Sequence, residues 1–380
     1  MKALSLVLLF SLLSLAADAA PDVNTINSKF GFNIFPADKT DWQMTAFRKR
    51  SGIRLNGSAG HYSARFRKTV LDAPAEELSV YTAPDGKTIE RISIVFANKG
   101  DTVDRHKSKI KAARRSVSSQ LTGQLGAPSR KSFYAGTLRE KTDMWKFNGT
   151  ELYLEVSKKE FLMLHIVPAG KNKTTQKSDG RDYSKNVKTN KFGDHWIPNI
   201  PMVDQGAKGY CVPATMARVF LYYGIKVDMH HLAKIGDTSR SGGTDTDRII
   251  KDVKSMRRRC NLKCSGFSGL SVRTVARYID KGFPIMWVMF STRELQQVYI
   301  FSRQNRRKAA SPQEWERSLK KISIPQKEDG PHLCLIIGYN RITDEIAVSN
   351  SWGDAHIAPT WIPMKVARKV CRNNLTVFSP

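Results

Sequence analysis

The segment from residue 169 to residue 190 divides the chain, because it can contribute less than any other stretch to a hydrophobic core. It reads A-G-K-N-K-T-T-Q-K-S-D-G-R-D-Y-S-K-N-V-K-T-N, with many lysines and almost no apolar side chains. Such a segment buries too little surface to offset the entropy that is lost on ordering. We therefore predict a flexible basic linker here, between a module of residues 20–168 and a domain of residues 191–380.

The first 19 residues have the layout of a secretory signal peptide. One lysine and an apolar run precede the small residues Ala17-Asp18-Ala19. The apolar run is short for a membrane span, and no other segment approaches the ~20 apolar residues that a helix needs to cross a bilayer. We expect a chain exported to the periplasm, the cell surface or the medium, with no transmembrane segment after signal cleavage.

The chain is strongly basic, with a formal net charge of +28 from 62 Lys and Arg against 34 Asp and Glu. These residues are spread along the whole length. Such a surface favours contact with an anionic polymer or surface, although a solvated basic surface without a partner is the simpler alternative. No recognition motif for nucleic acid accompanies the charge, so we expect no specific nucleic-acid partner.

The first module is predicted to be α+β. Asp85-Gly86 and Asn148-Gly149 each lie between two β-rich runs, which is typical of hairpin turns. Between the hairpins, residues 101–125 predict one long helix that begins at Asp101 and Asp104. No catalytic constellation appears in this module, so an inhibitory prodomain and a targeting or substrate-binding module both remain open.

An odd number of cysteines in an exported chain leaves at least one thiol outside the disulfides. We take Cys211 as that thiol; if the other four pair, three connectivities are open. The spacing Cys260-x3-Cys264 has no matching Cys/His pair, so we predict no metal site and no cofactor. The five cysteines are Cys211, Cys260, Cys264, Cys334 and Cys371.

Cys211 comes directly before the apolar run V-P-A-T-M-A-R-V-F-L-Y-Y, whose spacing predicts a buried helix that stops at Gly224. The positive end of a helix dipole lowers the pKa of a thiol, and Lys208 could lower it further. A buried structural cysteine is the alternative. The neighbouring His230 and His231 are expected to be ordinary surface or partly buried residues.

Two later segments favour the reactive interpretation. His332 opens the strand-like run H-L-C-L-I-I-G-Y-N, and Asn350 ends another in I-A-V-S-N-S-W-G. The order Cys211, His332, Asn350 and the N-S-W-G motif resemble the papain-like cysteine peptidase superfamily. The segment Q-G-A-K-G-Y-C also keeps the Gln-Gly pair of that superfamily and its spacing from glutamine to cysteine. The G-Y-C-V-P-A-T version is most similar to its C39-like bacterial branch. The resemblance covers residues 196–380 only.

The resemblance implies an α+β domain in which the helix bearing Cys211 packs on an antiparallel sheet bearing His332 and Asn350. It implies that Cys211 is the nucleophile, His332 its base and Asn350 the group that orients the imidazole. Gln205 and the backbone N–H of Cys211 would form the oxyanion hole, and Trp352 would support the site by shielding the bond between His332 and Asn350 from water.

The chain departs from the papain branch at two positions. Lys208 stands where that branch has a cysteine, and Val212 stands where it has a tryptophan. Disulfides and cleft details therefore do not transfer.

Three functions follow as hypotheses from these residues. The first is an exported cysteine peptidase that hydrolyses peptide amides in a peptide or protein substrate through an acyl-enzyme. The second keeps the nucleophile in a cell-wall peptide amidase or transamidase. The third is a binding or scaffolding protein whose site is catalytically vestigial.

Overall fold

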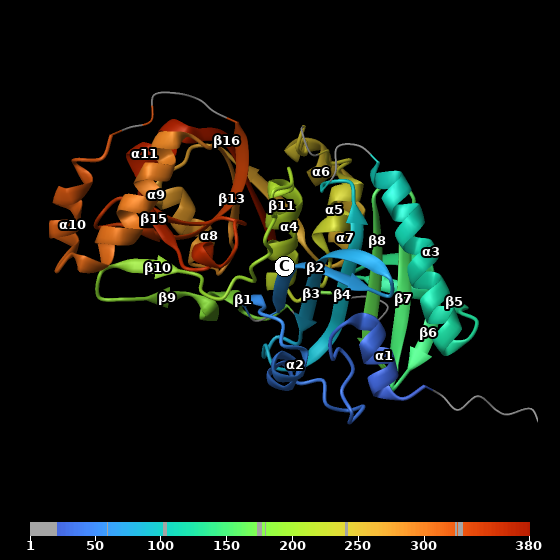
Figure 1. Ribbon diagram of the computed structural model, residues 1–380. Coiled ribbons are helices and arrows are strands. Elements are labelled where there is room, and N and C mark those ends of the chain that lie inside the picture. The colour runs from blue at the N-terminus through green and yellow to red at the C-terminus, as the bar shows by residue number, and fades with distance from the viewer. Residues whose placement is uncertain are drawn as a thin grey trace, which may run out of the picture.

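The computed structural model describes residues 21–380, except for residues 59, 102–104, 173–176, 179, 240–241, 324 and 326–329. The predicted signal peptide, residues 1–19, lies outside the described residues. Helices and two antiparallel sheets make up the described chain, which confirms the α+β class (Figure 1). Within these residues, every helix is too short or too polar to span a bilayer.

The first sheet is an eight-stranded antiparallel sheet built by residues 56–168. Both predicted hairpins are confirmed, and Asn148 and Gly149 adopt positive φ angles of 45° and 71° in their turn. In spatial order the strands are β1 (Asn56–Ser58), β2 (His61–Val70), β3 (Ala73–Thr82), β4 (Ile89–Asn98), β8 (Phe161–Pro168), β7 (Thr150–Ser157), β6 (Leu138–Phe147) and β5 (Ser129–Ala135).

Successive side chains of these strands point to opposite faces of the sheet, and both faces are buried. In β8, Leu162, Leu164 and Ile166 belong to the core under the first three helices, whereas Phe161 and Met163 face the second half of the chain. The helices over the first face are α1 (Val23–Phe30), α2 (Met44–Ser51) and α3 (His106–Leu125).

Helix α3 begins later than the sequence predicts. Its first residue is His106 rather than Asp101, while its end before Gly126 agrees with the prediction. Asp101 does not cap the helix, because its carboxylate pairs with the ammonium of Lys208 at 3.5 Å. Asp104 lies outside the described residues.

The second sheet carries most of the second half of the chain. Its central strand β13 pairs antiparallel with β12 and β10 along one edge and with β14 along the other. The strands are β9 (Lys188–Thr189), β10 (Asp194–Trp196), β11 (Lys263–Phe267), β12 (Ile285–Phe290), β13 (Pro331–Asn340), β14 (Glu345–Ser349), β15 (Thr360–Pro363) and β16 (Cys371–Ser379).

Helix α4 lies between the two sheets, which explains why eleven of its twelve residues are buried (Figure 1). The helices of this half are α4 (Cys211–Tyr222), α5 (Met229–Ile235), α6 (Thr246–Asp252), α7 (Lys254–Arg259), α8 (Val272–Ile279), α9 (Arg293–Asn305), α10 (Pro312–Leu319) and α11 (Met364–Val370). Short 3₁₀ turns are η1 (Tyr183–Asn186), η2 (Arg306–Lys308) and η3 (Asp354–His356).

The second half of the predicted linker carries structure of its own. Tyr183 is 2% exposed and packs against Tyr222 and Tyr223, with ring centroids 5.4 and 5.0 Å apart. The turn η1 follows, and β9 then pairs with β10. The buried ring of Tyr183 and the pairing of β9 with β10 hold this part of the segment on the second core, which the composition of the segment as a whole does not indicate.

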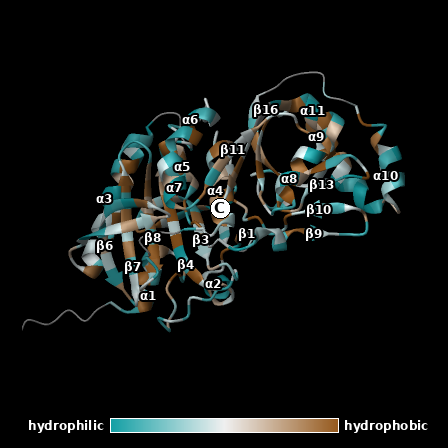
Figure 2. Cartoon of the chain, turned by 180° about the vertical axis from the view of Figure 1, so that it is seen from behind, coloured by the Kyte–Doolittle hydropathy of each residue, from teal (hydrophilic) through white to brown (hydrophobic). Residues whose placement is uncertain are grey.

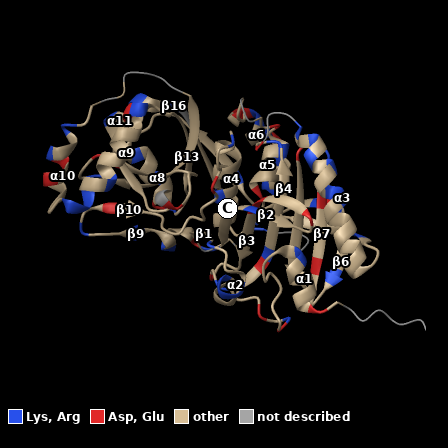
Figure 3. Cartoon of the chain, in the orientation of Figure 1, with Lys and Arg blue, Asp and Glu red and all other residues tan. Residues whose placement is uncertain are grey.

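Helix α5 packs on the free face of the first sheet (Figure 2). The prediction that His230 and His231 are ordinary surface or partly buried residues is wrong, because each is 1% exposed. His231 Nε2 lies 2.9 Å from the carboxylate of Glu155, which also bonds His165 Nε2 at 2.9 Å. Buried charge requires such a partner, and here the first module supplies it. Elsewhere Lys and Arg are spread over both halves (Figure 3).

Candidate active site

Cys211 is the first residue of α4. The backbone N–H of Ala214 donates to the Tyr210 carbonyl at 2.9 Å, so the first turn begins at the cysteine. One turn later, Thr215 Oγ1 donates to the Leu333 carbonyl at 3.0 Å. This bond ties the start of α4 to β13, at the residue that follows His332.

His332, Asn350 and Trp352 lie together at one edge of the β13–β14 pair. The register pairs Leu335 with Ser349, and its continuation brings Trp352 opposite His332. His332 Nε2 lies 2.9 Å from Asn350 Oδ1. The Trp352 ring stacks on the imidazole with centroids 4.6 Å apart, and His356 meets Trp352 edge-on at 5.2 Å.

The bond to Asn350 fixes the tautomer of His332. A carboxamide oxygen only accepts, so Nε2 carries the hydrogen and Nδ1 offers a lone pair. Burial lowers the pKa of His332 to about 4, against a smaller opposite effect of the Asn350 bond. Burial also raises the pKa of Cys211, while hydrogen bonds from the Leu333 and Val212 backbone act to lower it. For the thiol, the rise in pKa caused by burial thus outweighs the lowering expected at a helix start. Both the Cys211 thiol and the His332 imidazole are neutral at rest near pH 7.

Gln205 is hydrogen-bonded to Ser351, the residue between Asn350 and Trp352. Its backbone N–H donates to the Ser351 carbonyl at 2.9 Å, and its Oε1 accepts from Ser351 Oγ at 2.7 Å. Its Nε2 makes a long contact of 3.4 Å with the Lys208 carbonyl. With Oε1 held in this way, the amide N–H₂ is the end of Gln205 that can donate to another group.

Lys208 does not act on the thiol, contrary to expectation. Its ammonium lies 3.0 Å from Glu77 and 3.5 Å from Asp101, both in the first module. Burial lowers the pKa of Lys208, but these carboxylates outweigh that effect and raise it above its ordinary value. An ammonium that is 8% exposed needs carboxylate partners, and the chain provides them from a distant part of the sequence.

Arg218 is a residue of this region that sequence reasoning missed. It is completely buried in α4, and burial lowers its pKa to about 10. Its guanidinium donates to the Pro201 carbonyl at 3.0 Å and to the Ser349 carbonyl and hydroxyl at 3.1 and 2.6 Å. The signal was the single charged residue within the apolar run M-A-R-V-F-L.

All five cysteines are free thiols in the structure. Cys260 and Cys334 are buried, and Cys211, Cys264 and Cys371 are partly exposed. None of the three disulfide connectivities that the sequence left open is therefore formed.

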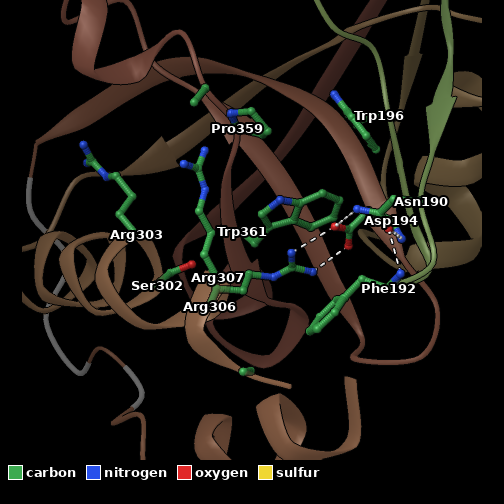
Figure 4. A pocket seen from close by; sticks show the side chains of 12 residues that line it. Asn190, Phe192, Asp194, Trp196, Ser302, Arg303, Arg306, Arg307, Pro359 and Trp361 are labelled. Carbon is green, nitrogen blue, oxygen red and sulfur yellow. Dashed lines mark hydrogen bonds and ion pairs between the residues drawn. The ribbon is translucent and has the colours of Figure 1, made fainter. Parts of the chain in front are cut away.

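A pocket of about 510 Å³ lies elsewhere in the second half, between β10, α9 and β15. None of the predicted site residues lines it. Arg306 forms its floor, with bonds of 2.6 and 3.0 Å to Asp194 and with its guanidinium between the rings of Phe192 and Trp361 (Figure 4). The ion pair and the two rings already engage this guanidinium, so Arg306 has a structural role in the pocket floor.

Comparison with known proteins bears on the second half of the chain. Residues 197–369 match the model of the Peptidase_C39 like family. A solved structure described as a C39-like peptidase from Bacillus anthracis is similar at 12% identity and a TM-score of 0.31, over 49% of this chain and 96% of that one. No curated protein matches the sequence.

Proposed function

Because residues 197–369 belong to the Peptidase_C39 like family, we propose that the chain is a cysteine peptidase whose nucleophile is Cys211. The observation that carries this proposal is the 2.9 Å bond between His332 and Asn350 on the strand pair to which the start of α4 is tied. A base held in one tautomer, on a strand that is bonded to the first turn of the helix bearing the thiol, fits the needs of nucleophilic catalysis.

In the first step, His332 Nδ1 accepts the proton of the Cys211 thiol, and the thiolate attacks the carbonyl carbon of the scissile peptide. Burial leaves His332 Nδ1 unprotonated near pH 7, because it lowers the pKa of His332 to about 4, and the same burial makes the imidazole a weaker base. The imidazolium that forms is stabilised by Asn350, whose oxygen accepts from Nε2 without adding a second charge.

The tetrahedral oxyanion accepts hydrogen bonds from Gln205 Nε2 and from the Cys211 backbone N–H. The two hydrogen bonds between Gln205 and Ser351 support this role, because a donor that is held in place before the reaction needs no reorganisation. The imidazolium then gives its proton to the leaving amine, and a thioester remains on Cys211. Water, deprotonated by His332, hydrolyses the thioester and restores the thiol.

We retain export as part of the proposal, on the strength of the first 19 residues of the sequence. A cell-wall peptide would then be one source of substrate, and the net charge of +28 favours an anionic wall polymer. Hydrolysis and transamidation share every step up to the thioester and differ only in the acceptor.

Turnover of a fluorogenic peptide library by the chain and by Cys211→Ala tests the proposal. We expect hydrolysis by the wild type, its loss in Cys211→Ala and its loss after alkylation with iodoacetamide. Product analysis with peptidoglycan and an added amine then separates hydrolysis from transfer. A wild type that neither turns over peptide nor reacts with iodoacetamide at Cys211 would favour the binding or scaffolding function.

A further inference from the structure

The first module is fixed to the loop that precedes the nucleophile. Glu77 and Asp101 hold the ammonium of Lys208, as described above. The backbone of Gly100 lies against the ring of Tyr210, so closely that a Cβ at this glycine would lie 2.7 Å from the ring. The module therefore has a defined place beside residues 204–210, which include Gln205.

A cavity of about 460 Å³ lies where the module meets this loop. The loop contributes Asp204, Gly206, Ala207 and Lys208, so the cavity begins at the direct neighbours of Gln205. The module contributes the remaining lining residues, which are Arg54, Asn56, Ser63, Ala64, Arg65, Arg67, Glu76, Glu77 and Asp101.

Three arginines line the module side of this cavity, together with three carboxylates. Arg65 and Arg67 lie two positions apart on β2 and line the same cavity, and Arg54 comes just before β1. The guanidinium of Arg65 reaches the loop, since a Cβ at Gly206 would lie 2.7 Å from its Nη2. All three side chains are exposed.

The carboxylates of the cavity lie near these arginines but are not ion-paired with them. Glu77 and Asp101 are paired with Lys208, and Asp204 Oδ1 accepts from the Gly206 backbone at 2.9 Å. Only Glu76 remains. Within the described part of the chain, Arg54, Arg65 and Arg67 form no ion pair with any carboxylate.

We propose that Arg54, Arg65 and Arg67 form a subsite for carboxylate side chains of the peptide substrate, and that the chain prefers acidic peptides. A guanidinium presents a planar fork that matches a carboxylate, and a side chain that is unpaired before binding loses no partner on binding. This inference rests on the proposed function, because the subsite flanks Gln205. It makes the first module a substrate-binding wall of the active site rather than a removable inhibitor.

The kinetic test uses two fluorogenic octapeptides that differ only in three glutamates against three glutamines around the scissile bond. We expect the wild type to show a kcat/KM at least tenfold higher for the glutamate peptide. In the variant R54Q/R65Q/R67Q this ratio should fall at least tenfold. The matched control is R114Q/R115Q, because both arginines are exposed on α3, on the other side of the first sheet. An unchanged ratio in the triple variant, or an equal fall in the control, overturns the proposal.

A binding test separates this subsite from catalysis. Fluorescence anisotropy of the labelled glutamate peptide is measured with Cys211→Ala, alone and combined with R54Q/R65Q/R67Q, and circular dichroism confirms that each variant is folded. We expect tighter binding of the glutamate peptide than of the glutamine peptide, and loss of the difference in the combined variant. That result without turnover by the wild type would refute the peptidase and keep the subsite; turnover without a charge-dependent difference would refute the subsite alone.

Discussion

Arg218 of α4 donates two hydrogen bonds to Ser349, the residue that precedes Asn350. The helix that begins with the candidate nucleophile thus holds the strand end that carries the candidate orienting amide. Both residues lie outside the segments G-Y-C-V-P-A-T and N-S-W-G. Their contact fixes Asn350 relative to α4.

Replacing Arg218 by Met keeps an apolar stem but leaves the Ser349 and Pro201 carbonyls without a donor. Each unsatisfied buried group costs about 1–3 kcal/mol. We therefore expect a lower free energy of unfolding in urea and a lower kcat with little change in KM. Arg273→Met is the control, because Arg273 is exposed on α8. Equal stability of the two variants would contradict the role of these bonds.

Replacing Gln205 by Ala removes one donor of the proposed oxyanion hole. We expect kcat to fall about 10²–10³-fold, since the lost bond is made in the transition state. Ser351→Ala should lower kcat less, because it loosens the amide without removing it. Peptide turnover at saturating substrate measures both. If Ser351→Ala were the more damaging change, Ser351 itself would need a direct role.

Protonation of His332 should destabilise the fold in acid. Its pKa is lowered from 6.5 to about 4, so below pH 6.5 the unfolded chain binds this proton first and stability falls until about pH 4. The loss from this group alone is about 2 kcal/mol at pH 5. Urea unfolding of the wild type and His332→Gln at pH 7 and pH 5 tests this. The variant should lose less stability between the two pH values, and an equal loss would show that His332 does not contribute.

Glu155 joins the two halves of the chain by bonding both His165 and His231. Burial raises the pKa of Glu155, but the two histidines outweigh that effect and hold it well below 4.5. The carboxylate therefore stabilises the fold above pH 4.5, and this contribution is lost as the pH falls towards its lowered pKa. Breaking a buried pair costs about 3–5 kcal/mol, so Glu155→Gln should lower the thermal midpoint strongly at pH 7. Calorimetry measures the thermal midpoint. The matched control is Glu316→Gln, which should leave the midpoint nearly unchanged because Glu316 is exposed.

Gly100 leaves room for the ring of Tyr210, the residue before Cys211. A methyl group there would lie 2.7 Å from the ring, and overpacking of this kind costs about 1–3 kcal/mol. Gly100→Ala should therefore lower stability and change the rate at which iodoacetamide alkylates Cys211, as peptide mapping by mass spectrometry can follow. Gly123→Ala in α3 has open space around the new methyl and should be neutral or stabilising. Normal alkylation in Gly100→Ala would show that the loop tolerates the shift.

Much of the fold follows from local sequence. The two hairpins were predictable because Asp85-Gly86 and Asn148-Gly149 decide their own turns, whatever the rest of the chain does. The start of α4 at Cys211 was predictable from the apolar period that follows it. The start of α3 was not, because Asp101 pairs with a lysine 107 positions later in the chain instead of capping the helix.

The candidate site divides in the same way. The order of Cys211, His332 and Asn350 and the N-S-W-G motif are written in the sequence, and so is the preference of each residue for a helix start, a strand start or a strand end. The strand register then brought His332 to Asn350 and Trp352. Only packing of the two halves decided that Lys208 meets Glu77, 131 positions away, and that His231 meets Glu155. Turns and helix starts depend on neighbouring residues, whereas a buried charge takes its partner from whatever surface the folded chain brings against it.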